Sequence, residues 1–226
     1  YDNWHKLHPE WLMYGSETAS AINSRGIYNR INGGSQTSDK QLTSYDNSAV
    51  GWGSVASDAW YTTITRDYLA GEYVWTGFDY LGEPSPYDTD AWPNHSSMFG
   101  IIDLASLPKD RYYLYRSIWN KKAKTLHVLP HWNWEGNEGK KVPVFAYTNY
   151  PSAELFINGK SYGKQTKNNQ SVENRYRLMW YNAIYEPGEM KVVAYDEQGK
   201  PAEEKVIRTA GKPHHLELTA NRNILT

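Results

Sequence analysis

Two apolar runs, each followed by a loop with glycine and acidic residues, constrain the fold of this chain most. The first is Trp11–Ser20 (WLMYGSETAS), in which a short apolar segment ends at Gly15 and the carboxylate of Glu17 follows. The second is Tyr73–Tyr87 (YVWTGFDYLGEPSPY). Short continuous apolar runs are typical of strands buried on both faces of a parallel sheet. Parallel α/β barrels carry catalytic groups at the carboxyl ends of such strands, but these residues alone are also consistent with an ordinary solvated loop glutamate at position 17.

The residues that follow the first run have the spacing of a helix. Over residues 54–70, apolar side chains recur every four residues. Ser54 or Ser57 is the expected N-cap, and Gly71 stands where a helix commonly ends.

A second helix is predicted over Pro108–Trp119, with Ser106 as its cap. The chain before Asn120 therefore predicts two strand–helix units, about residues 11–70 and 73–119, with their strands adjacent and parallel. Parallel strands buried on both faces need neighbours on both sides, and two of them cannot close a barrel. We therefore expect the chain to be part of a larger protein.

After Asn120 the hydrophobic period changes to two, which indicates β-strands. The predicted strands are Leu126–Leu129, Val142–Thr148, Ala153–Ile157, Tyr176–Trp180 and Met190–Tyr195. Turn signals separate them, and Asn158-Gly159 is a strong hairpin signal. Such a series predicts a small antiparallel sandwich. We place the domains at 1–122 for the strand–helix units, 123–212 for the sandwich, and 213–226 for the start of a further module, with a strand from His215.

Composition and charge argue against several classes of partner. The formal net charge is −1 and no basic block occurs, which argues against nucleic acid. The chain has no cysteine, and His5, His8, His127 and His131 lack partners at metal-ligand spacing, so we expect no metal and no cofactor. No apolar run approaches the ~20 residues of a membrane span.

Aromatic residues with a polar edge are unusually frequent. The chain has 10 Trp and 19 Tyr but only 4 Phe. Such rings pack on the apolar C–H faces of sugars, and they also fill large cores while their polar tips stay wet. Composition alone leaves both interpretations open.

Four motifs in order carry a resemblance to a known family: GSETAS, YDNSAVGWGS, GEYVWTGFDYLGEPSPY and SSMFGIIDLASLPKDRYYLYRSIW. They resemble the end of the catalytic barrel of family-two glycoside hydrolases, most closely the β-galactosidases of gut Bacteroidetes. Residues 124–211 resemble the immunoglobulin-like domain that follows that barrel. The resemblance implies an α/β plus all-β fold, with the last two βα units of a (β/α)8 barrel followed by an immunoglobulin-like β-sandwich.

The resemblance assigns Glu17 as the catalytic nucleophile at the end of the seventh barrel strand. A retaining glycosidase also needs a protonated carboxyl ~5–5.5 Å away. In the family this second glutamate lies on the fourth strand, and no glutamate here matches its motif. Glu72 precedes a predicted strand and Glu83 lies beyond it. We therefore interpret both as structural residues and not as the proton donor.

The resemblance also indicates substrate-binding residues. Trp75 matches a tryptophan at the floor of the sugar site, where a cis peptide bond to Thr76 turns the indole toward the cavity of the nucleophile; a barrel-core role is the alternative. Asp79 and Glu83 are candidates for hydrogen bonds to sugar hydroxyls, with structural pairing as the alternative. Asn94 and His95, in the following loop, are weaker candidates.

The resemblance implies a retaining glycoside hydrolase that cleaves terminal β-galactosides, of which this chain alone is inactive. The alternatives are a β-glucuronidase of the same family, against which Thr18-Ala19-Ser20 argues, and a non-catalytic carbohydrate-binding piece. Ser20 stands where the best-studied bacterial β-galactosidases have histidine, which weakens the transfer of their galactose contacts. The expected partners are carbohydrate and the rest of the parent enzyme; a homo-oligomer is compatible with the sequence. We expect a periplasmic or extracellular location.

Overall fold

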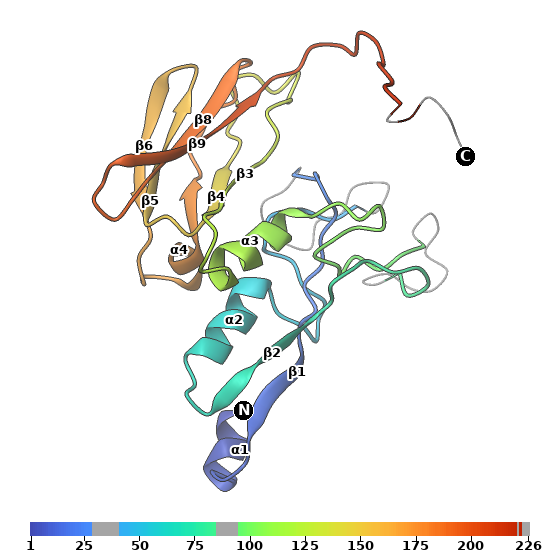
Figure 1. The fold of residues 1–226 in the computed structure, drawn as a ribbon, viewed down its shortest axis with the longest axis vertical. Helices are drawn as coiled ribbons and strands as arrows, with labels where there is room; N and C mark the ends of the chain where they lie inside the picture. Colours follow the sequence, from blue (N-terminus) through green and yellow to red (C-terminus); the bar gives the residue numbers. More distant parts are fainter. Residues whose placement is uncertain (29–40, 85–94, 221, 223–226) are drawn as a thin grey trace.

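A computed structural model describes residues 1–28, 41–84, 95–220 and 222 (Figure 1). The helices and strands before Asn120 are α1 (Asp2–Leu7), β1 (Met13–Ala19), α2 (Ala56–Ile64), β2 (Leu69–Trp75) and α3 (Asp110–Trp119). After them come β3 (Leu126–Leu129), β4 (Val144–Thr148), β5 (Ser152–Ile157), β6 (Lys160–Thr166), α4 (Val172–Tyr176), β7 (Arg177–Trp180), β8 (Glu189–Tyr195) and β9 (Pro201–Arg208). Within the described ranges, no helix is long and apolar enough to cross a membrane.

Strands β1 and β2 are adjacent and parallel, as predicted. Their bounds differ from those of the apolar runs, because β1 continues through Glu17 to Ala19 and β2 begins at Leu69. Gly71 therefore lies inside β2 and is not the end of the preceding helix, which stops at Ile64. Because Leu69 pairs with Met13, β2 includes residues 69 and 70, which the helical spacing had assigned to the preceding helix.

Within this chain, strands β1 and β2 are covered on one face and exposed on the other. Helices α2 and α3 lie between the β1–β2 pair and the sandwich in Figure 1. Toward α2, Ala19 packs with Ala59 and the half-buried Val74. Tyr14 and Tyr73, which meet edge to face, remain 56% and 70% exposed.

The helix caps also differ from the sequence prediction. Helix α2 has Val55 at its N-cap, without a side-chain hydrogen bond. Its first N–H groups are instead satisfied by Asp46, whose carboxylate accepts from the N–H of Ala56 at 3.1 Å and of Ser57 at 3.2 Å. A carboxylate at a helix N-terminus satisfies unpaired donors and interacts favourably with the helix dipole.

Helix α3 forms where it was predicted, but Lys109 and not Ser106 is its N-cap. Ser106 lies in a turn before it, with φ of 63°. The apolar run Phe99–Leu104 does not form a strand with a partner; it makes isolated bridges, among them the parallel one between Phe78 and Ile102.

The sandwich consists of two antiparallel sheets, with strand orders β3-β4-β7 and β6-β5-β8-β9. All five strands predicted after Asn120 are present, within two residues of their expected bounds. Sequence reasoning missed β6 and β9, because both are polar and largely exposed. The core between the sheets includes Trp132, Leu155 and Trp180.

The predicted hairpin at Asn158-Gly159 joins β5 to β6, and both residues have positive φ, 48° and 81°. This is the backbone that the favoured two-residue hairpin turns require. The strand expected from His215 onward is not formed in residues 215–220 or 222, which are exposed and irregular.

The strand–helix part and the sandwich share a second core. It joins Leu114 and Ile118 of α3 to Phe145 and Tyr147 of β4. Buried Arg177 of β7 reaches across to Asp46, with Nη2 3.5 Å from Oδ2, and donates to the Ser57 hydroxyl at 3.0 Å. The domain boundaries at 122 and 212 stay a prediction.

We expect Asp46→Ala to lower the free energy of unfolding by roughly 3–5 kcal/mol, because it leaves Arg177 buried without its carboxylate and α2 without its cap. Asp46→Asn, which keeps one acceptor oxygen, should lose less. Urea unfolding followed by tryptophan fluorescence measures the difference. Arg208→Ala is the control, because its pair with Glu189 is exposed and worth ~0–1 kcal/mol. Equal losses of unfolding free energy for Asp46→Ala and Arg208→Ala would contradict the role of Asp46 as the partner of Arg177 and the cap of α2.

We also expect Gly100→Ala to destabilise the protein by ~1–3 kcal/mol, because a Cβ there would lie 2.1 Å from the Asp79 nitrogen and 2.4 Å from the Phe78 carbonyl carbon. Gly77→Ala is the matched control, since its Cβ would meet nothing within 4 Å. The melting temperatures of the two variants provide the comparison. A Gly100→Ala variant as stable as Gly77→Ala would show that the backbone approach at residue 100 is not required.

Candidate functional site

Glu17 lies near the end of β1 at a break in the strand register. Gly15 pairs with Glu72 and Thr18 with Val74, so β1 uses three steps where β2 uses two. Such bulges re-aim side chains and are common beside active sites. The Glu17 side chain is exposed, and no described residue donates a hydrogen bond to it.

The backbone just after Glu17 adopts a conformation that is rare for residues other than glycine. Ala19 and Ser20 are both buried and have φ of 66° and 52°. Left-handed residues of this kind cost ~1–3 kcal/mol each and persist only where surrounding contacts enforce them. Here the contacts come from the loop before α2: the Ser54 N–H donates to the Ala19 carbonyl at 2.6 Å and the Val50 N–H to the Ser20 carbonyl at 3.3 Å.

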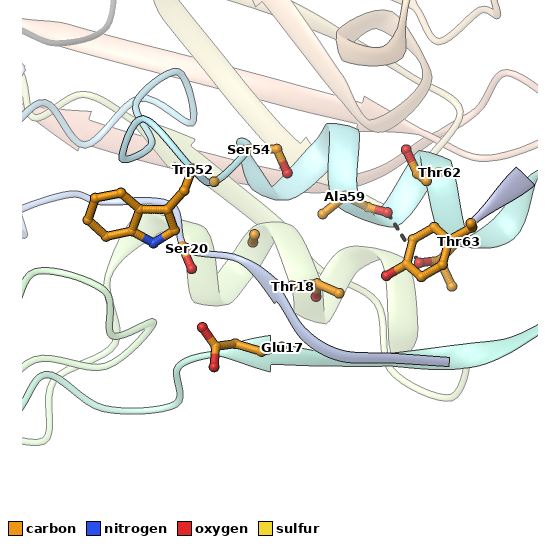
Figure 2. Close-up of a pocket in the computed structure, with 11 residues that line it drawn as sticks. Glu17, Thr18, Ser20, Trp52, Ser54, Ala59, Thr62 and Thr63 are labelled. Carbon is orange, nitrogen blue, oxygen red and sulfur yellow. Dashed lines mark hydrogen bonds between the residues drawn. The ribbon is translucent and has the colours of Figure 1, made fainter. Parts of the chain in front are cut away.

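Glu17 borders a pocket of about 300 Å³ between the end of β1 and helix α2 (Figure 2). This volume is at the lower end of that of small-molecule sites. The described residues that line it are Tyr1, Glu17, Thr18, Ala19, Ser20, Trp52, Gly53, Ser54, Ala59, Thr62 and Thr63. Among these, Glu17 is the one carboxylate. The arrangement offers one accessible carboxylate, several hydroxyls and one indole.

Trp75 lies at the end of β2, and its peptide bond to Thr76 is cis, as expected. The half-buried indole packs against a cluster that includes Met98 and Phe99, and it meets Tyr80 edge to face at 6.0 Å. Among the described residues, Trp75 does not line the pocket of Glu17. The cavity that we expect Trp75 and Glu17 to share stays a prediction.

Asp79 is held in a nearly buried ion pair. The Lys109 ammonium lies 2.8 and 2.7 Å from its two oxygens, and the Gly100 N–H donates to it at 2.7 Å. Burial lowers the pKa of Lys109 to about 8 and raises that of Asp79, while the attraction between the two groups opposes both shifts. Asp79 lines a different pocket from Glu17, together with Asn23.

The remaining candidates lie away from Glu17 or outside the described residues. Glu83 is exposed and accepts a hydrogen bond from the Tyr80 hydroxyl at 2.5 Å; burial, and then this bond, raise the pKa of Tyr80 to about 12. The His95 carbonyl accepts from the Gly82 N–H. Asn94 lies outside the described residues.

Glu72 does not precede a strand, as its interpretation assumed, but lies within β2. It accepts a hydrogen bond from the Thr63 hydroxyl of α2 at 2.8 Å. Burial raises its pKa, and the bond from Thr63 opposes that shift. Its contact with the helix agrees with a structural role.

Sequence reasoning missed Trp52, which the structure places in the same pocket as Glu17. Its signal was the Gly51-Trp52-Gly53 tripeptide inside the quoted motif YDNSAVGWGS. Nothing local to this tripeptide indicates Glu17 as a neighbour. Over the described ranges, no group of three or more His, Asp and Glu side chains is arranged to hold a metal ion.

Comparison with known proteins identifies relatives over nearly the whole chain. Residues 139–203 match a family described as a domain of unknown function (DUF4982). The chain is 41% identical to the β-galactosidase BoGH2A of Bacteroides ovatus, over 93% of this chain and 25% of that protein. It is 36% identical to a putative β-glucuronidase of Formosa agariphila, over 77% of this chain and 16% of that protein.

Solved structures agree with the sequence relatives. A β-glycosidase from Bacteroides vulgatus superposes with a TM-score of 0.81 at 31% identity, over 98% of this chain and 30% of that one. A glycosyl hydrolase family 2 member from Bacteroides cellulosilyticus superposes with a TM-score of 0.72 at 25% identity, over 98% and 28%. The chain thus spans less than a third of the length of these relatives. The chain belongs to the family-two glycoside hydrolases over nearly its whole length.

Proposed function

We propose that this chain is part of a retaining glycoside hydrolase that cleaves terminal β-galactosides, and that Glu17 is its nucleophile. The observation that carries the proposal is the exposed carboxylate at a bulged strand end, in a pocket with hydroxyls and an indole. Units β1–α2 and β2–α3 are then two βα units of a (β/α)8 barrel, which the parallel β1–β2 pair supports.

The chemistry proceeds in two displacements. In the first, a Glu17 oxygen attacks the anomeric carbon; the bond from that carbon to the leaving oxygen breaks, and a second carboxyl gives that oxygen a proton. In the second, water attacks the same carbon and yields its proton to the second carboxylate. As water attacks, the bond from the anomeric carbon to the Glu17 oxygen breaks, which restores the Glu17 carboxylate, and the sugar leaves with its original configuration.

The second carboxyl is assigned to a part of the parent protein outside this chain. It must lie ~5–5.5 Å from Glu17 for a retaining mechanism. Glu72 is committed to Thr63, and Glu83 accepts from Tyr80 in a different loop. Neither of these glutamates lines the pocket of Glu17.

A β-galactoside is the preferred substrate because the relative of higher identity is named a β-galactosidase. A β-glucuronide is the second candidate, since the other relative is named a putative β-glucuronidase. The residues after Glu17, Thr18-Ala19-Ser20, differ from the Tyr-Gly that we expect after the nucleophile in many β-glucuronidases. A panel of nitrophenyl galactoside and glucuronide tests the choice, and cleavage of neither would favour a non-catalytic carbohydrate-binding role.

In the parent enzyme, we expect Glu17→Gln to lower kcat at least ~10³-fold while sugar binding is retained, because the amide cannot act as the nucleophile. Glu72→Gln is the matched control, because it makes the same change on the adjacent strand at a residue that contacts α2. The activity of this variant should stay within a few-fold of that of the unsubstituted parent. Glu17→Ala with azide and a dinitrophenyl galactoside should form an α-configured glycosyl azide, because azide attacks from the face that the carboxylate vacates. A β-configured azide would assign Glu17 to proton transfer instead.

We further expect purified residues 1–226 to fold without hydrolysing nitrophenyl glycosides, because one of the two required carboxyls is missing from the pocket. Circular dichroism verifies folding, and the Glu17→Gln variant of the same chain sets the background rate. Turnover by the chain that exceeds this background and is lost with Glu17→Gln would place both carboxyls within it.

A further inference from the structure

Trp52 is an exposed indole at the end of β1 where Glu17 lies. Within this chain the residue is 75% exposed. Within the described parts of the chain, it makes no ring contact and no hydrogen bond. Figure 2 shows the indole and the Glu17 carboxylate at the same end of the strand, with Ser20 between them, and both line one pocket.

The backbone around Trp52 is fixed to the strand that carries Glu17. The Gly53 N–H donates to the Val50 carbonyl at 2.9 Å, and the Val50 and Ser54 N–H groups donate to residues 20 and 19. Gly53 packs so closely that an added Cβ would lie 2.4 Å from the Ala19 carbonyl oxygen. The turn is therefore placed by two residues that follow Glu17 almost directly. A side chain on such a turn is already positioned, which lowers the entropic cost of binding.

The position of the indole fits the leaving-group side of the substrate better than the side of the sugar that reacts. The sugar that reacts with Glu17 must be enclosed and shielded from water, whereas the leaving group extends toward solvent. Trp52 stands on the loop between β1 and α2, the kind of loop that forms the rim of a barrel active site. Ser20, Ser54 and Thr62 provide hydroxyls in the same pocket.

We propose that Trp52 is the platform for the sugar on the leaving-group side, stacking its indole face on the C–H face of a neutral pyranose. This inference rests on the proposed function and adds to it a residue that selects oligosaccharides over substrates without a second ring. Trp52 takes no part in bond breaking, so it acts on substrate binding and on the orientation of the leaving group.

The test compares two substrates in the parent enzyme. Lactose has a pyranose as its leaving group, whereas β-galactosyl fluoride has none for Trp52 to contact. We expect Trp52→Ala to lower kcat/KM for lactose about tenfold, the factor that corresponds to ~1.4 kcal/mol of lost contact, and to leave the fluoride within about twofold. Trp52→Phe keeps an aromatic face and should retain most of the lactose activity. Trp134 belongs to the sandwich and lies outside the pocket. Trp134→Ala should therefore leave the activity on both substrates unchanged.

Each outcome has a separate meaning. If Trp52→Ala lowers kcat/KM equally for both substrates and also lowers the melting temperature, the residue packs against the rest of the parent, and the platform is rejected. Unchanged lactose activity rejects it as well. If the unsubstituted parent cleaves neither the fluoride nor lactose but cleaves glucuronyl fluoride, the galactoside assignment has failed, and the comparison is repeated with glucuronyl fluoride and a glucuronyl disaccharide. If it cleaves no glycosyl fluoride, the proposed function fails and the platform falls with it.

Discussion

The buried carboxylate of Asp46 connects the parts of this molecule on which its site depends. The carboxylate accepts from the first N–H groups of α2 and pairs with Arg177 of β7. The backbone N–H of Asp46 donates to the Tyr147 hydroxyl of β4. A charge buried to this extent is stable only when it is paired and hydrogen-bonded, and both conditions are met here. Because Asp46 fixes the start of α2, it also fixes the loop before that helix. The sandwich therefore contributes to the position of a loop that lies beside Glu17.

That loop in turn determines the shape of the end of β1. Its N–H groups bind the carbonyls of Ala19 and Ser20, which hold the left-handed conformation that follows Glu17. In an unbroken strand, successive side chains would alternate between the two faces of the sheet. The register break at Glu17 and this turn interrupt that alternation and leave the carboxylate accessible. Strain of this kind is typical of functional sites, since the surrounding structure must supply the free energy that maintains it. The chemistry proposed for Glu17 thus rests on contacts from both parts of the chain.

The same arrangement explains why the candidate residues separate into two groups. Glu17 and Trp52 gather at the end of β1, whereas Asp79 lies at the end of β2 in a pair with Lys109. The Asp79–Lys109 pair joins the loop after β2 to the start of α3, and Gly100 permits the close approach of the two backbones. A nearly buried carboxylate with two strong donors has little capacity left for a ligand. Its position therefore agrees with the structural alternative that the sequence left open.

The sequence by itself determined the features that depend on local patterns. Period two located β5, β7 and β8, and short apolar runs located β3 and β4. Asn158-Gly159 located a hairpin because of its positive φ. Apolar content located the parallel β1–β2 pair. Only the tertiary structure revealed the polar edge strands β6 and β9, whose pairing uses backbone groups and leaves no apolar pattern. Likewise, the cap of α2 by Asp46, the extension of β1 through Glu17 and the approach of Trp52 to that residue depend on contacts between segments distant in the chain, which no local pattern encodes.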